Sequence, residues 1–220
     1  RFAYKKGFSF LSFIKNHNMY TLPLLFLGLF SWVTNYIDRF IIEKYMGYEE
    51  LGIYNANYGL GSKFFLILNP IFLILLTPKV YNESSLLNKK NAIINGSKYY
   101  SYLGFFLLIL VFLFDNFFGS LFLSESYSSG FYLIPWVALC YFIVTLIYLY
   151  EVLFYSNLNT RPILHGIIIS SLSNVLCNFL FIPIFGLIGA VFSLFVSSLF
   201  RFWFIFIKFE KYENSNNRSN

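Results

Sequence analysis

The chain has 220 residues, of which 58% are hydrophobic, 23% aromatic and only 12% charged. A soluble domain of this size could not bury so much apolar surface, so the composition excludes soluble globular classes and predicts an integral membrane protein. The net charge of +6 does not indicate a nucleic-acid partner, because such binding needs a basic face on a soluble fold. The chain begins at Arg1 without a signal-peptide pattern, and we expect it to be the later part of a longer protein or a trimmed one.

Six apolar runs are long enough to cross a bilayer, which takes about 20 helical residues. We therefore predict an all-α integral membrane bundle of six transmembrane helices, at residues 18–42, 50–78, 94–116, 130–157, 161–183 and 186–208. The longest connection between them is expected at residues 81–93. Residues 1–17 mix lysines with large apolar side chains, which predicts an amphipathic cytoplasmic lead-in, and residues 209–220 are expected to form a polar cytoplasmic tail.

Basic residues accumulate at one end of the predicted spans. Six spans put both termini on one side, and that side holds twelve Lys and Arg residues, whereas only Arg39 and Lys44 lie near the other side. Because positively charged loops stay in the cytoplasm, we predict a multi-pass protein of the cytoplasmic membrane with both termini inside. The twelve residues are Arg1, Lys5, Lys6, Lys15, Lys79, Lys89, Lys90, Lys98, Arg161, Lys208, Lys211 and Arg218.

The first two predicted spans carry charges that need a partner or a cavity, because a charge at the bilayer centre is costly. Asp38 and Arg39 lie near the outer boundary of the first span, and we interpret them as a salt-bridge corner that fixes the hairpin to the second span. Lys63 lies near the middle of the second span, about 20 Å from either end, and shares a face with Asn55 and Gly59. We expect Lys63 to face a cavity or an anion, with a buried ion pair as the alternative.

Two further charges lie at similar depths in the fourth and sixth spans. Glu151 occupies the last turns of the fourth span, and Arg201 lies about 22 Å from the outer end of the sixth. Arg201 could snorkel to the surface, pair with Glu151 or face a hydrated cavity. Tyr141, Tyr148 and Tyr155 fall roughly on the face of Glu151, which predicts that this face is wet.

The fifth span carries amides on one face and ends in a corner. Asn174 and Asn178 are four residues apart, so they lie on one helical face. They could hydrogen-bond to a neighbouring helix or line a hydrated cavity, and we expect them to do both. Pro183 and Gly186 follow, and we expect them to let the fifth and sixth spans turn within very few residues.

Several kinds of site have no signature in this sequence. There is no His/Cys cluster with metal-ligand spacing, no nucleotide-binding loop and no nucleophile elbow. We therefore predict neither a metal nor another cofactor, and we do not expect an enzyme.

Two segments resemble a known family of membrane proteins. Residues 22–61 contain a Pro-bearing span that runs into Asp-Arg-Phe-Ile-Ile at 38–42, a short loop and Gly-Ile-Tyr at 52–54. This segment is similar to the seventh and eighth spans of bacterial polysaccharide exporters. Residues 174–190, NVLCNFLFIPIFGLIGA, resemble the signature of that family near its eleventh and twelfth spans. The resemblance is to the O-antigen and teichoic-acid flippases of the multidrug/oligosaccharidyl-lipid/polysaccharide exporter superfamily.

This resemblance implies a specific architecture and activity. Members of the family have twelve to fourteen spans in two six-helix bundles, and they move an undecaprenyl-diphosphate-linked oligosaccharide across the cytoplasmic membrane by alternating access. The chain would be the C-terminal bundle, whose partners are the lipid-linked oligosaccharide, membrane lipids and either the missing N-terminal six-span lobe or a second copy. The family's surface-polysaccharide role includes lipopolysaccharide O-antigen assembly in bacteria.

The residues of the expected cavity follow from the chemistry of that substrate. We predict that Lys63 and Arg201 pair with the diphosphate or acidic sugars, and that Asn55, Asn174 and Asn178 bond sugar hydroxyls. A multidrug exporter and a lipid II flippase of the same superfamily remain alternatives. A membrane polysaccharide polymerase or ligase, and a scaffold without transport activity, are the alternatives from other classes.

Overall fold

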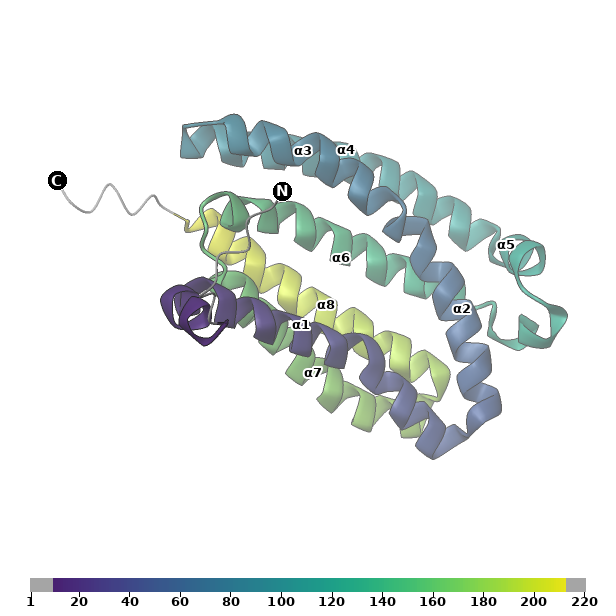
Figure 1. Ribbon diagram of the computed structural model, residues 1–220. Coiled ribbons are helices and arrows are strands. Elements are labelled where there is room, and N and C mark those ends of the chain that lie inside the picture. The colour runs from purple at the N-terminus through teal and green to yellow at the C-terminus, as the bar shows by residue number, and fades with distance from the viewer. Residues whose placement is uncertain (1–9, 213–220) are drawn as a thin grey trace, which may run out of the picture.

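The structure is a computed structural model that describes residues 10–212, with the side chains of residues 25–212. This part of the chain is all helical, with eight α-helices and one 3₁₀-helix (Figure 1). Six helical segments in it are long and apolar enough to cross a membrane, which confirms the predicted fold class. The first nine residues of the expected lead-in and the last eight of the expected tail lie outside the described residues.

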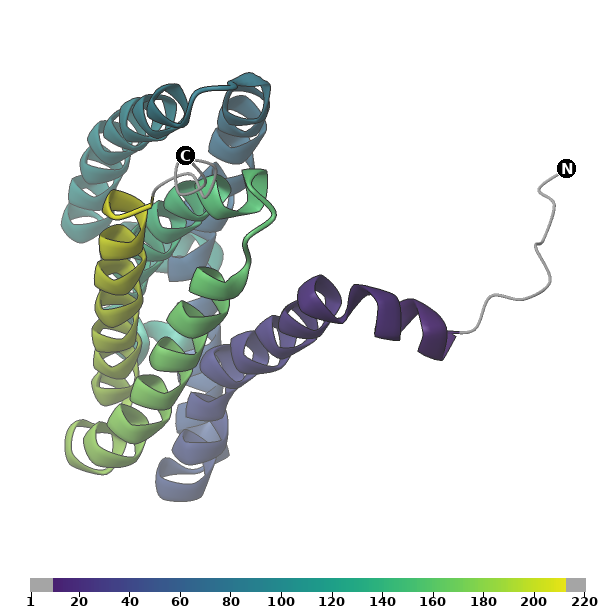
Figure 2. The ribbon, with the colours of Figure 1, turned by 90° about the vertical axis from the view of Figure 1, so that its left-hand side faces the viewer.

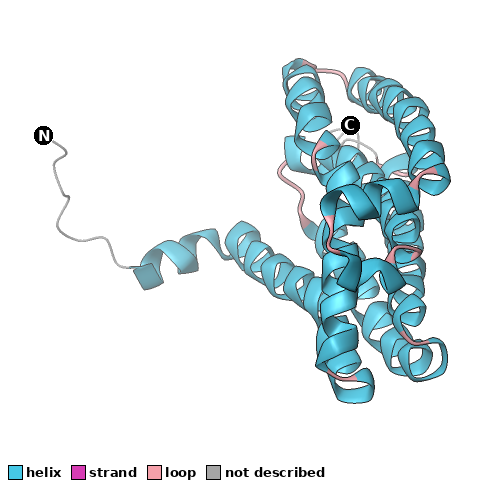
Figure 3. Ribbon diagram, turned by 90° about the vertical axis from the view of Figure 1, so that its right-hand side faces the viewer, coloured by secondary structure: helices cyan, strands magenta, loops and turns pink. Residues whose placement is uncertain are grey.

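Helix α1 (Phe10–Met46) contains the first candidate span, at Leu25–Met46. Its C-terminal part packs on α7 and α2, whereas its N-terminal part leans away from the other helices (Figures 2 and 3). The side chains of Leu25 and Leu29 are accordingly more than half exposed. The N-terminal part of α1 therefore does not cover the side of the bundle on which its C-terminal part packs.

The second span is bent, although the sequence predicted a single helix. It consists of α2 (Tyr48–Leu66) and α3 (Leu68–Asn82), which meet at Ile67. The bend follows from Pro70, which has no N–H to donate to the carbonyl of Leu66 and whose ring crowds that carbonyl. The two helices together form one apolar candidate span, residues 48–82.

The connection expected at residues 81–93 is mostly helix. Helix α4 (Leu86–Leu113) begins there, so only residues 83–85 join α3 to α4. Lysines and asparagines fit a helix when apolar neighbours pack on one side, and Ile93 is fully buried. The connection between α4 and α6, by contrast, holds the short helix α5 (Asp115–Phe122) and the 3₁₀-helix η1 (Glu125–Gly130).

Helix α6 (Leu133–Ser156) is the centre of the bundle. It packs against α2, α3, α4 and α8, as its place in Figure 1 shows. It is apolar nearly all round, which is typical of a helix with neighbours on every side. Any polar side chain on α6 is therefore held inside the protein, where it needs a partner or a cavity.

Helices α7 (Arg161–Phe185) and α8 (Leu187–Glu210) form the tightest pair, joined by Gly186 alone. Gly186 has φ +65° and ψ −141°, a conformation that side-chain-bearing residues rarely adopt. A Cβ atom on Gly189 would lie 2.3 Å from the carbonyl oxygen of Phe181, so only glycine allows this approach. The corner expected after Pro183 is therefore present, and it depends on two glycines.

Candidate functional site

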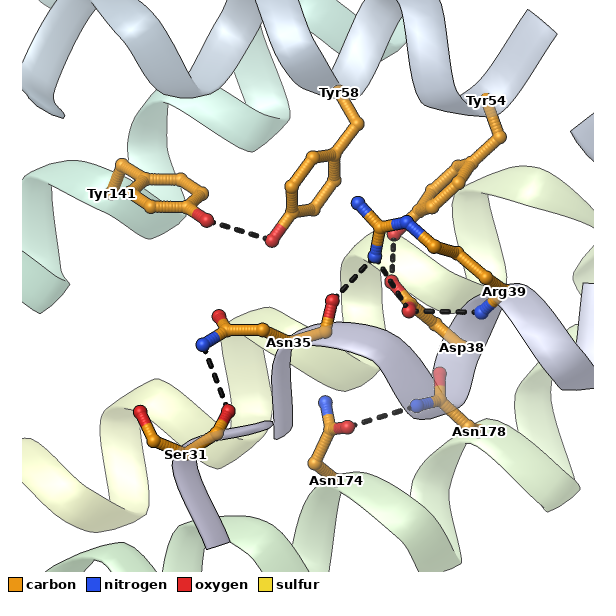
Figure 4. Close-up of polar contacts among 9 residues, drawn as sticks. All are labelled: Ser31, Asn35, Asp38, Arg39, Tyr54, Tyr58, Tyr141, Asn174 and Asn178. Carbon is orange, nitrogen blue, oxygen red and sulfur yellow. Dashed lines mark hydrogen bonds and ion pairs between the residues drawn. The ribbon is translucent and has the colours of Figure 1, made fainter. Parts of the chain in front are cut away.

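A partly buried ion pair lies near the end of α1, on the side that faces α2 (Figure 4). The Asp38 carboxylate is buried and accepts hydrogen bonds from the Tyr54 hydroxyl and from Arg39, whose Nη1 lies 3.0 Å away. Arg39 also donates to the backbone carbonyl of Asn35. Asp38 thus links α1 to α2, which is the arrangement that the sequence suggested for a salt-bridge corner.

Aromatic side chains extend this pair toward the centre of the bundle. The Arg39 guanidinium lies 4.8 Å from the ring centre of Tyr58 and 5.1 Å from that of Tyr36. The Tyr58 and Tyr141 hydroxyls are 2.8 Å apart, which connects α2 to the central helix (Figure 4). The sequence analysis missed Tyr54 and Tyr58, although their spacing of four residues on one face was the available signal.

The two amides of the fifth span bond to each other and to α8. Asn178 donates to the Oδ1 of Asn174 at 3.0 Å, and Asn174 donates to the Ser197 hydroxyl at 3.4 Å (Figure 4 shows the amide pair). Both amides are almost fully buried. The Oδ1 of Asn178 has no hydrogen-bond partner among the described residues. These contacts match the packing role that the sequence allowed, and neither amide lines the two cavities described next.

Glu151 and Arg201 form another ion pair, which is buried between α6 and α8. The Arg201 Nη2 donates to the Glu151 Oε1 at 2.7 Å, and both side chains are less than a tenth exposed. The guanidinium also lies 5.5 Å from the ring centre of Tyr148. Of the three options for Arg201, the structure favours the ion pair, so its charge is already balanced within the bundle.

A small polar cavity adjoins this ion pair. It has a volume of about 40 Å³ and lies among α1, α6, α7 and α8. Its polar lining includes Ser31, Asn35, Tyr148, Ser198 and Arg201. A water molecule needs about 10–15 Å³ of such volume, so two or three waters fit. The face of α6 that was predicted to be wet therefore borders a cavity with polar groups at Tyr148.

A larger groove lies on the other side of Tyr148, between α3 and α6. Its volume is about 370 Å³, within the range of small-molecule sites. Polar groups from both helices line it, namely Asn69, Thr77, Tyr81, Tyr148 and Tyr155. Asn69 is buried, and its Oδ1 has no hydrogen-bond partner among the described residues. The sequence analysis did not select Asn69, because the bend that brings it to the groove was not foreseen.

Lys63 and Asn55 lie elsewhere, on the outward face of α2. Both side chains are exposed, whereas the opposite face of α2 packs on α6 and η1. Lys63 is about 22 Å along the helix from Tyr48, deep within a candidate span. The structure does not bring Lys63 together with Arg201 or with the two amides of α7. The predicted cavity residues therefore fall into separate places, with Lys63 and Asn55 on an open face and the others inside the bundle.

Comparison of the chain with protein-family models, with curated proteins and with solved structures finds no match. The function is therefore inferred from the residues and their arrangement. The six long apolar helices support a multi-span membrane protein.

Proposed function

We propose that the chain forms one six-helix bundle of a flippase that moves a lipid-linked oligosaccharide across the membrane. The observation that carries this proposal is the groove between α3 and α6, which lies within apolar candidate spans. Its surface is largely apolar, but one amide and four hydroxyl-bearing residues are among the seven residues that line it. Sugars offer many hydroxyl groups, which need such partners when they leave water. Tyrosine rings add flat apolar faces on which a sugar ring can pack.

The uncharged lining of the groove suits a neutral glycan. Its lining has no Asp, Glu, Lys or Arg among the described residues. The nearby charges of Glu151 and Arg201 balance each other. The unpaired Oδ1 of Asn69 supplies an acceptor for a sugar hydroxyl. Binding of a sugar there would replace an unsatisfied polar atom with a hydrogen bond, which favours binding.

Lys63 suits the other polar part of the substrate, the diphosphate. It is an exposed cation deep within a candidate span, on a face of α2 that no described helix covers. A cation facing lipid at that depth is costly, so a partner or a water-filled space should cover this face. We propose that the second lobe, or a second copy of the chain, covers it and that the diphosphate binds there. The isoprenoid tail stays in the lipid.

Transport in this proposal is a movement of bundles and involves no covalent chemistry. Alternating access by rocking of one bundle on another needs flexible joints in the helices that line the path. The bend before Pro70 and the divergent half of α1 are suited to this role. The chain then acts as a transporter and not as an enzyme.

The alternatives differ in the groups they require. A multidrug exporter for cations would need acidic side chains in its cavity, and the α3–α6 groove lining has none among the described residues. A lipid II flippase would use the same groups for another glycan. A polymerase or ligase would need a catalytic set near the outer loops, where the described part of the chain has only α5 and η1 between long helices.

The experiment is complementation of export in cells that lack the gene. Asn69→Leu should reduce surface glycan strongly while expression stays normal, because the Asn69 Oδ1 has no hydrogen-bond partner among the described residues whose loss would weaken the fold. Asn95→Leu is the matched control, since Asn95 is exposed on α4 outside the groove. Lys63→Ala should also reduce export, with Lys98→Ala as its control. Unchanged export in Asn69→Leu and Lys63→Ala would show that these site assignments are wrong.

A further inference from the structure

A second pocket lies at the opposite end of the bundle from Gly186, where α7 begins and α8 ends. Its volume is about 520 Å³, and it is separate from the α3–α6 groove. The α6–α7 connection and the first turn of α7 form one wall, and Lys208 in the last turn of α8 forms the other. The proposed transport path does not use any of these residues.

The lining of this pocket is basic. Arg161, His165 and Lys208 contribute to it, and no acidic side chain does so among the described residues. Arg161 and Lys208 are both exposed, and neither forms a salt bridge among the described residues. Two full positive charges therefore meet at one pocket without a carboxylate to balance them.

The start of α7 adds to the positive potential. Thr160 makes no side-chain capping hydrogen bond, and Pro162 has no N–H of its own. The positive end of the α7 dipole therefore points at the pocket without an anionic cap. Anions bind favourably at such helix ends, and here Arg161 and Lys208 line the same pocket.

The pocket also lies where two candidate membrane spans end. Arg161 begins one candidate span, and Lys208 lies within the last turn of another. Leu158, at the rim of the pocket, is 74% exposed and has φ +51°. An exposed leucine next to two cations without a salt bridge among the described residues, at the end of two spans, suits a ligand with an anionic head and apolar tails.

We propose that this pocket binds the phosphate of an anionic phospholipid. Arg161 and Lys208 contact the phosphate oxygens, and Leu158 lies against the start of the acyl chains. A free phosphate ion shares the headgroup chemistry but has no part that would contact Leu158. The site would fix the end of the α7–α8 pair in the leaflet that holds the basic loops. This inference does not depend on the proposed transport activity.

The test compares lipid binding by the full chain and by two charge-matched double variants. The chain is purified in a neutral detergent and titrated with phosphatidylglycerol or phosphatidylcholine, and bound lipid is counted by native mass spectrometry. A surface cation contributes about fivefold to the affinity for an anionic lipid. Arg161→Gln with Lys208→Gln should therefore weaken phosphatidylglycerol binding about 25-fold. Lys79→Gln with Lys98→Gln removes the same charge elsewhere and should leave it within about twofold.

Three results would overturn the proposal. Equal weakening in both double variants would mean that net charge alone attracts the lipid. Equal binding of phosphatidylcholine and phosphatidylglycerol would mean that the pocket does not recognise an anionic head. Displacement of phosphatidylglycerol by millimolar inorganic phosphate would assign the site to a free anion. Arg161→Lys keeps the charge, and it should retain most of the phosphatidylglycerol affinity, which separates a charge effect from a folding defect.

Discussion

Removal of one member of the Glu151–Arg201 pair should destabilise the bundle strongly. Glu151→Leu leaves the arginine buried without a counter-charge, and Arg201→Met leaves the carboxylate in the same position. Breaking a buried pair in this way typically costs about 3–5 kcal/mol of the free energy of unfolding. In Arg201→Met, the Glu151 carboxylate can become neutral by binding a proton. In Glu151→Leu, the Arg201 guanidinium keeps its charge. Glu151→Leu should therefore cost more than Arg201→Met.

The geometry of the ion pair narrows the expected loss in the free energy of unfolding for each variant. A single hydrogen bond of 2.7 Å joins the two side chains, and the Arg201 Nε has no hydrogen-bond partner among the described residues. The adjoining cavity of about 40 Å³ can admit water to a stranded charge. We therefore expect about 4 kcal/mol for Glu151→Leu, in the middle of the range, and about 3 kcal/mol for Arg201→Met, at its lower end. The double variant should lose about 1 kcal/mol or less, since it strands no charge.

The assay is reversible unfolding of the purified chain in mixed micelles, followed by circular dichroism as the fraction of denaturing detergent rises. The two single variants and the double variant complete a double-mutant cycle with the unmodified chain. We expect a coupling energy of several kcal/mol, because the second substitution removes the charge that the first one strands. Single variants that each lose under about 0.5 kcal/mol, with additive effects, would refute this account of the pair.

Substitutions at three other positions test the packing and the polar contacts by the same unfolding assay. Gly189→Ala should cost about 1–3 kcal/mol, because its Cβ would meet the carbonyl of Phe181; an unchanged stability would mean that α7 and α8 can separate freely. Gly186→Ala should cost about 1–3 kcal/mol through its backbone conformation, and Gly186→Asn should cost a similar amount, because asparagine tolerates the left-handed α region but not a ψ of −141°; an unchanged stability in Gly186→Ala would contradict this reason. Tyr58→Phe should cost about 1 kcal/mol, since it removes the hydrogen bond to Tyr141; no loss would indicate that water replaces the bond.

The helical class and the six spans were predictable because they depend on the number of consecutive apolar residues. Bilayer thickness sets that number, so a count along the chain finds each span. The corner at Gly186 was predictable for a similar reason, since a proline and a glycine mark a local turn. The bend at Ile67 was not foreseen, because a proline within a span can either kink the helix or be accommodated by it.

The site was less predictable than the fold, because it depends on which helices become neighbours. The pairing of Glu151 with Arg201 was one of three options for the arginine, and only the packing of α6 on α8 distinguishes them. Asn69 gave no signal, since its importance arises from the groove that the bent second span forms with α6. The depth of Lys63 in its span could be counted along the sequence. Whether Lys63 lies on the packed or the open face of α2 depends on which helices become neighbours, so it could not be predicted. Its role as a substrate contact stays a prediction.

The most direct test of the central claim is the leaflet in which lipid-linked oligosaccharides accumulate when cells lack the gene. A flippase predicts that completed units build up on the inner leaflet and that surface glycan is lost. The units there should be inaccessible to an enzyme added outside the cells. Accumulation of single units on the outer leaflet would contradict the account and indicate a polymerase or ligase. The absence of any accumulation would contradict it as well, and would favour drug export or a scaffold.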